Sequence, residues 1–252
     1  MIFTLAAREL RSMFLSPLAW AIIGVVQFIL AFIFAVSLQD YLVVQQQRLH
    51  LYNMALGITD FVVVPIYSAA AFIMMFTIPL ITMRIISEEK RSTSIALLFS
   101  APLSMAEIVL GKYLGIVAFL AIMSLVYTLM PLSLLFAGAL NWGLFMSAFL
   151  GTFLMVSACA AIGLFMSSLT KQPIIAAMST FGAVLLLWIL SLAGNSNTGE
   201  AVNLLSYLSM LDHLQAFQRG IFSTSDFAYY LLVIIVFLVL SIRRLDSDRL
   251  QR

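Results

Sequence analysis

The side chains most able to do chemistry lie in one short charged run near residue 90. Arg84 is followed closely by Glu88, Glu89, Lys90 and Arg91. No nucleophile–base pair or metal-ligating set accompanies them. The chemistry that such a run supports is electrostatic, because charges at a protein surface steer and orient a partner. A charge run is also typical of an ordinary solvated loop, so the run alone does not choose between docking and simple solvation.

The few reactive side chains elsewhere do not form a catalytic or metal-binding group. The two histidines, His50 and His213, are both expected in outer loops, and the single cysteine, Cys159, sits inside an apolar run. We expect Cys159 to be a small packing residue. The sequence has no G-x-x-x-x-G-K-[ST] motif and no loop large enough for a nucleotide-binding fold. An intramembrane enzyme, a metal site and ATP hydrolysis by this chain are therefore not expected.

Composition places the chain in a membrane. Hydrophobic residues make up 63% of the 252 residues and charged residues only 10%, whereas soluble domains carry about 25% charged residues. Apolar runs of about the length that crosses a bilayer cover 18–38, 61–83, 109–136, 143–169, 174–193 and 227–242. We expect an all-α membrane protein with six spans, forming a single transmembrane domain over 1–252. The first run is long enough to be retained rather than cleaved as a signal peptide.

Positive charge fixes the expected orientation. Of the 13 Lys and Arg residues, only Arg48 and Arg219 fall on the outer side if the six runs thread back and forth. Cytoplasmic loops carry the excess of Lys and Arg, so both termini are expected in the cytoplasm, in a bacterial inner membrane. The net charge of +2 is too small to indicate a nucleic-acid partner. The partner indicated by composition is the lipid bilayer.

The first residues form a separate element. On a helical wheel of 2–14, Arg8 and Arg11 share one side, and the other side is apolar and contains Phe3, Ala6, Ala7, Leu10, Met13 and Phe14. This pattern predicts an amphipathic helix in the cytoplasmic interface. Ser16-Pro17 ends it, because proline suits the first turn of the next helix.

The cytoplasmic segment 84–108 is the longest inner loop. After the charged run it contains a short apolar helix candidate, 93–100, which Pro102 ends. Ser104 and Glu107 then form an S-x-x-E capping box that starts the third span. A short helix held between two spans can bind in a groove on a soluble partner and pass its movement to both spans.

Two outer segments and two small-residue repeats complete the pattern. The segment 39–60 is polar in its middle and is expected to contain a short helix, while 194–226 carries an amphipathic stripe that is too short to cross the membrane.

Small residues recur four positions apart in two places, at Gly111 and Gly115 and at Gly143, Ser147 and Gly151. Such spacing lets helices approach closely, and we favour internal packing over a dimer contact.

Two stretches resemble ABC-2 type transporter permeases, most closely those of the gliding-motility-associated subfamily. The first is Ser87-Glu88-Glu89-Lys90-Arg91 with Leu97-Leu98, Ala101-Pro102 and Glu107-Ile108-Val109-Leu110-Gly111-Lys112. The second is the run from His213 to Ile221, which matches a His-x-x-x-Phe-x-Arg-Gly-Ile pattern through His213, Phe217, Arg219 and Gly220. The layout of interface helix, six spans and unequal loops is similar over nearly the whole chain.

The resemblance implies a non-catalytic permease subunit of an exporter. Such permeases form dimers with a second copy or a homologue, and each half docks on a separate ATPase subunit that binds ATP and Mg²⁺. The implied coupling residues are Arg84, Glu88, Glu89, Lys90, Arg91 and Glu107, with Arg8 and Arg11 on the interface helix. In the gliding subfamily a membrane protein with a large periplasmic part accompanies the permease. No cofactor is implied in this chain itself.

A membrane scaffold that docks a cytoplasmic ATPase without transporting anything is the alternative reading. Both readings share the topology and differ in whether ATP hydrolysis by the partner is stimulated and used. The spans lack central charges, so a lipid-linked or amphipathic substrate, or mechanical action on a partner protein, are both compatible with the sequence.

The charge asymmetry predicts a topology that reporter fusions can check. Fusions at residues 90, 171 and 250 should report a cytoplasmic location, and fusions at 45 and 205 an external one, because the Lys and Arg excess stays inside. A cytoplasmic signal at 205 would overturn the six-span arrangement.

Overall fold

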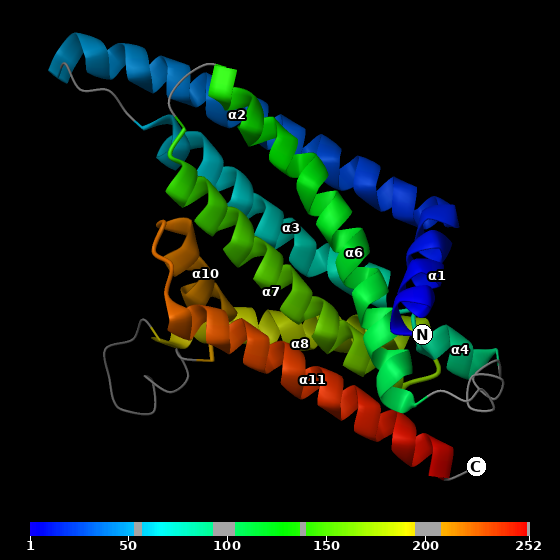
Figure 1. The fold of residues 1–252 in the computed structure, drawn as a ribbon. Helices are drawn as coiled ribbons and strands as arrows, with labels where there is room; N and C mark the ends of the chain where they lie inside the picture. The colour runs from blue at the N-terminus through cyan, green and yellow to red at the C-terminus, as the bar shows by residue number, and fades with distance from the viewer. Residues whose placement is uncertain (53–56, 93–103, 137–139, 195–207, 251–252) are drawn as a thin grey trace.

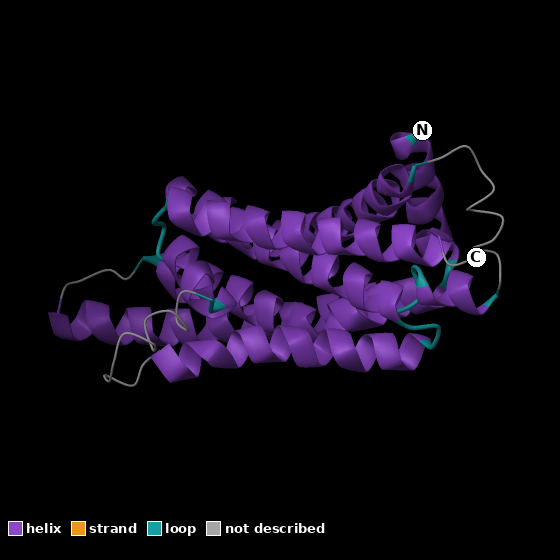
Figure 2. Cartoon of the chain, turned by 90° about the horizontal axis from the view of Figure 1, so that it is seen from below, coloured by secondary structure: helices purple, strands orange, loops and turns teal. Residues whose placement is uncertain are grey.

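The computed structural model describes five stretches of the chain, and every regular element in them is helical. These stretches are residues 1–52, 57–92, 104–136, 140–194 and 208–250. Six of their helices are long and apolar enough to cross a membrane. The prediction of an all-α membrane protein with six spans is confirmed (Figure 1 and Figure 2).

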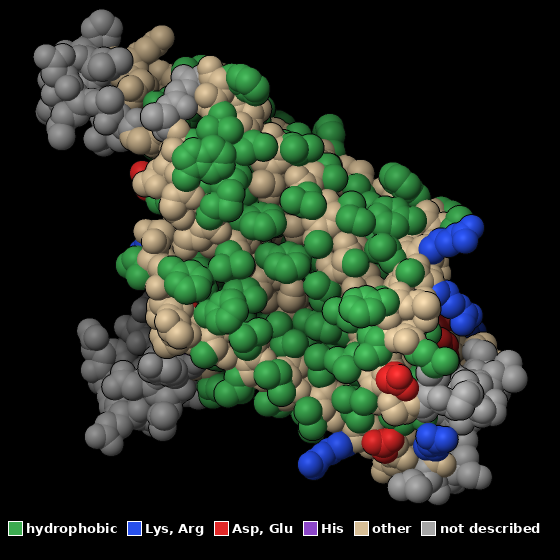
Figure 3. Space-filling model, viewed as in Figure 1, with side chains coloured by type: hydrophobic (Ala, Val, Ile, Leu, Met, Phe, Trp, Pro, Cys, Tyr) green, Lys and Arg blue, Asp and Glu red, His purple; other side chains and the backbone are tan. Residues whose placement is uncertain are grey.

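The spans pack side by side as one bundle. They are α2 (Pro17–Tyr52), the π-helical turn η1 (Thr59–Val63) continued by α3 (Val64–Thr82), α6 (Met105–Leu132), α7 (Trp142–Leu169), α8 (Pro173–Gly194) and α11 (Thr224–Leu250). Shorter helices are α1 (Ile2–Leu15), α4 (Ser87–Arg91), η2 (Ser133–Phe136) and α10 (Met210–Gln218). Both chain termini and α4 lie at one end of the bundle, called here the charged end (Figure 1). Apolar side chains cover the middle of the face in Figure 3, and most charged ones gather at the charged end.

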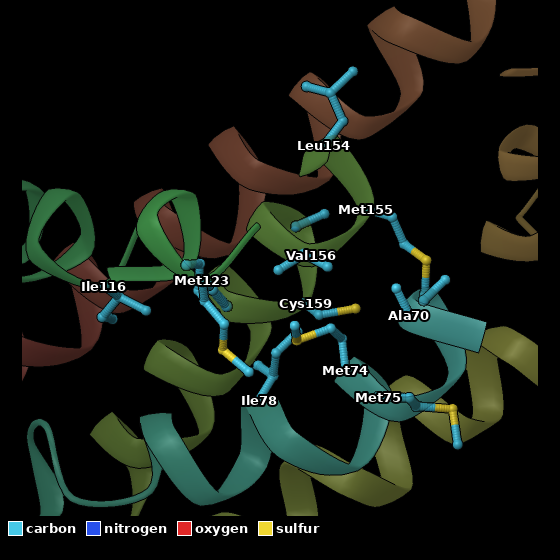
Figure 4. Packing of buried hydrophobic residues seen from close by; sticks show 14 of the residues in the cluster. Ala70, Met74, Met75, Ile78, Ile116, Met123, Leu154, Met155, Val156 and Cys159 are labelled. Atoms are coloured by element: carbon cyan, nitrogen blue, oxygen red, sulfur yellow. The ribbon is translucent and has the colours of Figure 1, made fainter. Parts of the chain in front are cut away.

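The central helix of the bundle is α7, which packs against α3, α6, α8, α10 and α11. It is apolar on all sides, as expected of a helix surrounded by others. Ala158, Ala160 and Ala161 are fully buried, and such small side chains let neighbouring backbones approach closely. Cys159 lies in the buried apolar cluster that also contains Met74 (Figure 4). The predicted packing role of Cys159 is confirmed.

The break between the first helix and the first span is where the sequence predicts it. Helix α1 ends at Leu15, Ser16 adopts an extended conformation with φ −82° and ψ 126°, and Pro17 begins α2. The Trp20 indole N–H donates to the Phe14 carbonyl across this elbow at 2.8 Å.

Two helices are longer than predicted. The first span was expected to end at 38 and to be followed by a loop with a separate short helix, but α2 continues to Tyr52. The last span, expected over 227–242, is part of a helix that runs from Thr224 to Leu250. In both cases the continuation contains no Gly or Pro, so nothing in the local sequence stops the helix. The other spans agree with the prediction to within about one helical turn.

The start of α6 has the predicted capping box. The Glu107 amide donates to Ser104 Oγ at 3.2 Å, and the Ser104 amide donates to Glu107 Oε2 at 3.0 Å. The short helix candidate 93–100 and Pro102 lie outside the described residues.

The contact between α3 and α7 yields a stability prediction at Gly163. A methyl group added there would lie 2.8 Å from Thr82 Cβ and still closer to its hydroxyl, which donates to the Ile78 carbonyl. Gly163→Ala should destabilise the fold by about 1–3 kcal/mol through overpacking, measured by thermal unfolding in detergent. Gly182→Ala on α8, where nothing lies within 4 Å of the added carbon, is the matched control and should not lower Tm. Equal Tm values for both variants would contradict the close approach.

Candidate coupling site at the charged end

The charged run that stood out in the sequence forms the short helix α4, directly after α3. Arg84, Glu88 and Arg91 are exposed, Glu89 is half-buried, and Lys90 is 8% exposed. The structure therefore brings three of the five charges to the surface. The expectation that this run presents its charges to the cytoplasm does not hold for Lys90, which faces inward.

A serine at the end of α7 holds the turn that leads into α4. The Ser167 hydroxyl accepts hydrogen bonds from the amides of Ile86 and Ser87, both at 3.1 Å, and donates to the Met83 carbonyl at 3.1 Å. Ser167 is fully buried, so these bonds are shielded from water. The sequence reasoning did not single out Ser167, because nothing local distinguishes it from other serines in the spans.

Lys90 connects α4 to the ends of two other helices. Its ammonium donates to the Ser168 carbonyl, at the end of α7, and to the Asp248 carboxylate on α11. Arg244 Nη2 lies 3.6 Å from the other oxygen of Asp248, one turn away on the same helix. A buried ion pair does not by itself stabilise a fold, but it favours the one arrangement that satisfies it. This pair fixes α4 relative to α11.

Lys112 makes a second buried connection, between α1, α4 and α6. Its Nζ donates to the Ile85 carbonyl at 3.0 Å and to Glu89 Oε1 at 2.7 Å, and lies 3.5 Å from Glu9 Oε2. Lys112 is 2% exposed. An ammonium has three donors, and three acceptors surround this one. Neither Lys112 nor Glu9 was identified as a structural charge from the sequence.

Helix α1 packs along α6 through the predicted small residues. A side chain at Gly111 would collide with Leu5, and one at Gly115 would collide with Glu9 and the Ala6 carbonyl. Internal packing at this pair of glycines is confirmed. A similar close approach occurs on α7, where Gly151 faces Phe217.

The side of α1 that packs against the bundle coincides in part with the apolar side predicted from the wheel. Leu10, Met13 and Phe14 of that side pack against the core, whereas Phe3 is 81% exposed and Ala7 is also exposed. Leu5, which was not assigned to that side, packs against the core. The rotation has a physical cause, because it turns Glu9 toward the buried Lys112. Arg8 and Arg11 are exposed, as expected for the polar side.

Glu107 stands apart from the exposed charges of α4. Its carboxylate accepts from the Ser104 amide and hydroxyl at the start of α6. The geometry thus gives it a helix-capping contact.

The family-like segment from His213 to Ile221 forms most of α10 and the turn after it. His213 is buried, its Nδ1 lies 2.6 Å from Asp226 Oδ1, and its ring stacks on Tyr229 with centroids 4.1 Å apart. Phe217 is fully buried against α7. The sequence reasoning missed Asp226, although an acidic residue in the first turn of α11 was a usable signal.

The turn after α10 explains two further residues of the pattern. Arg219 is exposed, and Gly220 has φ of 77°. Side chains with a Cβ rarely adopt that conformation, so a glycine here suits the turn. The expected amphipathic segment 194–226 is thus a short packed helix in its described part, and 195–207 lies outside the described residues.

The described part of the charged end combines exposed charges with buried ionic connections. Within the described stretches no three His, Cys, Asp or Glu side chains are grouped so that they could hold a metal ion. The exposed charges of α4 instead lie on a short helix that the buried Lys90 connects to α7 and α11, and that Lys112 of α6 connects to α6 and α1.

Comparison with known proteins gives one family match. Residues 3–250 match the model of a family described as "ABC-2 family transporter protein". No curated protein matches the chain.

Removing the Lys112 ammonium should loosen α1 and α4 together. Lys112→Met leaves two carboxylates facing each other, and we expect a loss of about 2–3 kcal/mol. This loss is smaller than the loss expected when one partner of a fully buried ion pair is removed, because both carboxylates retain some access to water. Thermal unfolding in detergent measures the loss of stability. Lys171→Met is the control, because Lys171 is an exposed lysine near the charged end. Adding Glu9→Gln and Glu89→Gln to Lys112→Met should restore part of the loss. If Lys112→Met behaves like the control, Lys112 does not hold the site.

Proposed function

Because the chain belongs to the ABC-2 family of transporter proteins, we propose that it is the permease subunit of an exporter driven by a separate ATPase. The family match covers residues 3–250, and the six spans account for most of the chain. The sequence lacks a P-loop motif, so ATP and Mg²⁺ would bind to the partner. This subunit would couple the partner's ATP hydrolysis to outward transport or extraction.

The observation that best supports coupling is the way α4 is held. Arg84, Glu88 and Arg91 are exposed on or beside this helix. Beneath them, Lys90 and Lys112 connect the same helix to α1, α6, α7 and α11. A displacement of α4 by a docked subunit would therefore be transmitted to several membrane helices at once, as a packed bundle transmits shifts of its elements.

The proposed location is the bacterial inner membrane, with both termini in the cytoplasm. The charged end carries the termini and α4 (Figure 1), and an excess of Lys and Arg is typical of the cytoplasmic side. The ATPase would then meet α4 in the compartment that supplies ATP.

A second permease copy or homologue is the other proposed partner. Helices α2 and α8 expose large apolar side chains along their length, including Phe28 and Phe32 on α2 and Met178 and Leu186 on α8. Such faces suit lipid or another membrane helix. The resemblance to the gliding-motility subfamily extends the proposal to a membrane protein with a large periplasmic part.

A scaffold that docks the ATPase without transporting anything would differ from a permease in one measurable respect. A permease should stimulate ATP hydrolysis by the bound subunit in reconstituted membranes, whereas a scaffold should leave the rate unchanged. Purification of the wild-type chain from native membranes followed by mass spectrometry is expected to recover the ABC ATPase needed for this assay.

The coupling assignment predicts the effect of reversing the exposed charges of α4. Glu88→Lys with Arg91→Glu should lower recovery of the ATPase about tenfold and reduce stimulated hydrolysis, because charges at an interface orient and hold the partner. Glu89 is left unchanged because it binds Lys112. Arg219→Glu, an exposed reversal outside the charged end, is the control. Normal assembly and turnover in the double variant would reject α4 as the coupling element.

A further inference from the structure

A pocket of about 380 Å³ opens at the charged end, beside the Lys112 connection. Its walls come from α1, the first turns of α2, the end of α3, α4 and α6. The bonds of Lys90 and Ser167 that hold α4 lie outside the pocket, whereas Lys112 and Glu89 line it. Its volume is within the range of ligand-binding pockets.

One half of the pocket is apolar and belongs to membrane-spanning helices. Leu18 and Ile22 of α2 and Leu80 and Ile81 of α3 line it, and Leu18 and Leu80 are exposed. Trp20, which is 59% exposed, lies on the same first turn of α2. Exposed tryptophans are typical of the boundary between bilayer and water. The apolar half therefore sits where acyl chains begin.

The other half is charged, with equal numbers of cations and carboxylates. The cations are Arg8, Arg84 and Lys112, and the carboxylates are Glu9, Glu88 and Glu89. Glu9 and Glu89 are turned to Lys112. The remaining three, Arg8, Arg84 and Glu88, are exposed and form no ion pair with any described side chain.

We propose that this pocket binds one zwitterionic phospholipid with a primary ammonium, of the phosphatidylethanolamine type. The phosphate would pair with Arg8 and Arg84, since guanidinium groups bind phosphate oxygens through charge-assisted hydrogen bonds. The ammonium would donate to Glu88. The first part of an acyl chain would lie along Leu18 and Leu80.

The Glu88 carboxylate selects this headgroup over an anionic one. A site for a purely anionic lipid is marked by a cluster of Lys and Arg, and here one of the three charged groups without an ion pair among the described residues is a carboxylate. A trimethylated ammonium has no N–H to donate, so a choline headgroup would lose its bond to Glu88. The inference rests on the membrane location of the chain and does not depend on which ATPase it binds.

Native mass spectrometry of the purified full-length chain tests the proposal. The chain is reconstituted with equal amounts of phosphatidylethanolamine, phosphatidylglycerol and phosphatidylcholine and then released in detergent. One phosphatidylethanolamine per chain should be retained, about tenfold above either other lipid. Free phosphoethanolamine should compete weakly, because it has no acyl chain to fill the apolar half. Strong competition by it, or equal retention of the three lipids, would overturn the proposal.

Three variants locate the site. Arg8→Gln with Arg84→Gln should reduce retention of phosphatidylethanolamine about tenfold, while Glu88→Gln should remove the preference over phosphatidylcholine. Ser12→Trp, an exposed residue of the lining, should block the pocket without changing a charge. Arg11→Gln, exposed on the same helix but outside the pocket, is the control. Circular dichroism and size-exclusion profiles confirm folding, and unchanged retention in all three folded variants would place any bound lipid elsewhere.

Discussion

The arrangement of the charged end depends on one buried ammonium, that of Lys112. An isolated charge in an apolar bundle is costly, so the surrounding chain must bring acceptors to it. Three parts of the chain supply an acceptor to this ammonium, namely the Ile85 carbonyl, Glu89 of α4 and Glu9 of α1. This requirement turns Glu9 inward and with it sets the rotation of α1. Gly111 and Gly115 then allow α1 to lie close enough for the bond to form.

The same constraint explains why a short helix with four charges has a defined position. On its own, α4 has too few residues to be stable in water. Ser167 caps its start, Lys90 reaches the ends of α7 and α11, and Glu89 reaches Lys112. The remaining charges, Arg84, Glu88 and Arg91, are exposed and are accessible to a partner. One charged run is thus divided into buried charges that hold the helix and exposed charges that face away from it.

Within the bilayer the bundle is held by shape rather than by charge. Side chains of neighbouring helices pack closely against small residues of α7, because Phe217 lies next to Gly151 and Thr82 lies next to Gly163. Lipid tails are as apolar as the spans, so close packing rather than exclusion of water holds the helices together. The largely exposed apolar faces of α2, α8 and α11 suit contact with lipid.

The sequence by itself determined the spans, the break at Ser16 and Pro17, and the start of α6 at Ser104 and Glu107, because hydrophobic length and capping act between residues close in the chain. The ends of α2 and α11 were placed too early, since polar residues mark the membrane boundary but do not stop a helix. Only the tertiary structure decided which charges are buried. Lys90 meets Asp248 across 158 residues, and Lys112 meets Glu89 across 23. Such pairs form only after the helices have packed, so no local pattern distinguishes Lys90 from its exposed neighbour Arg91.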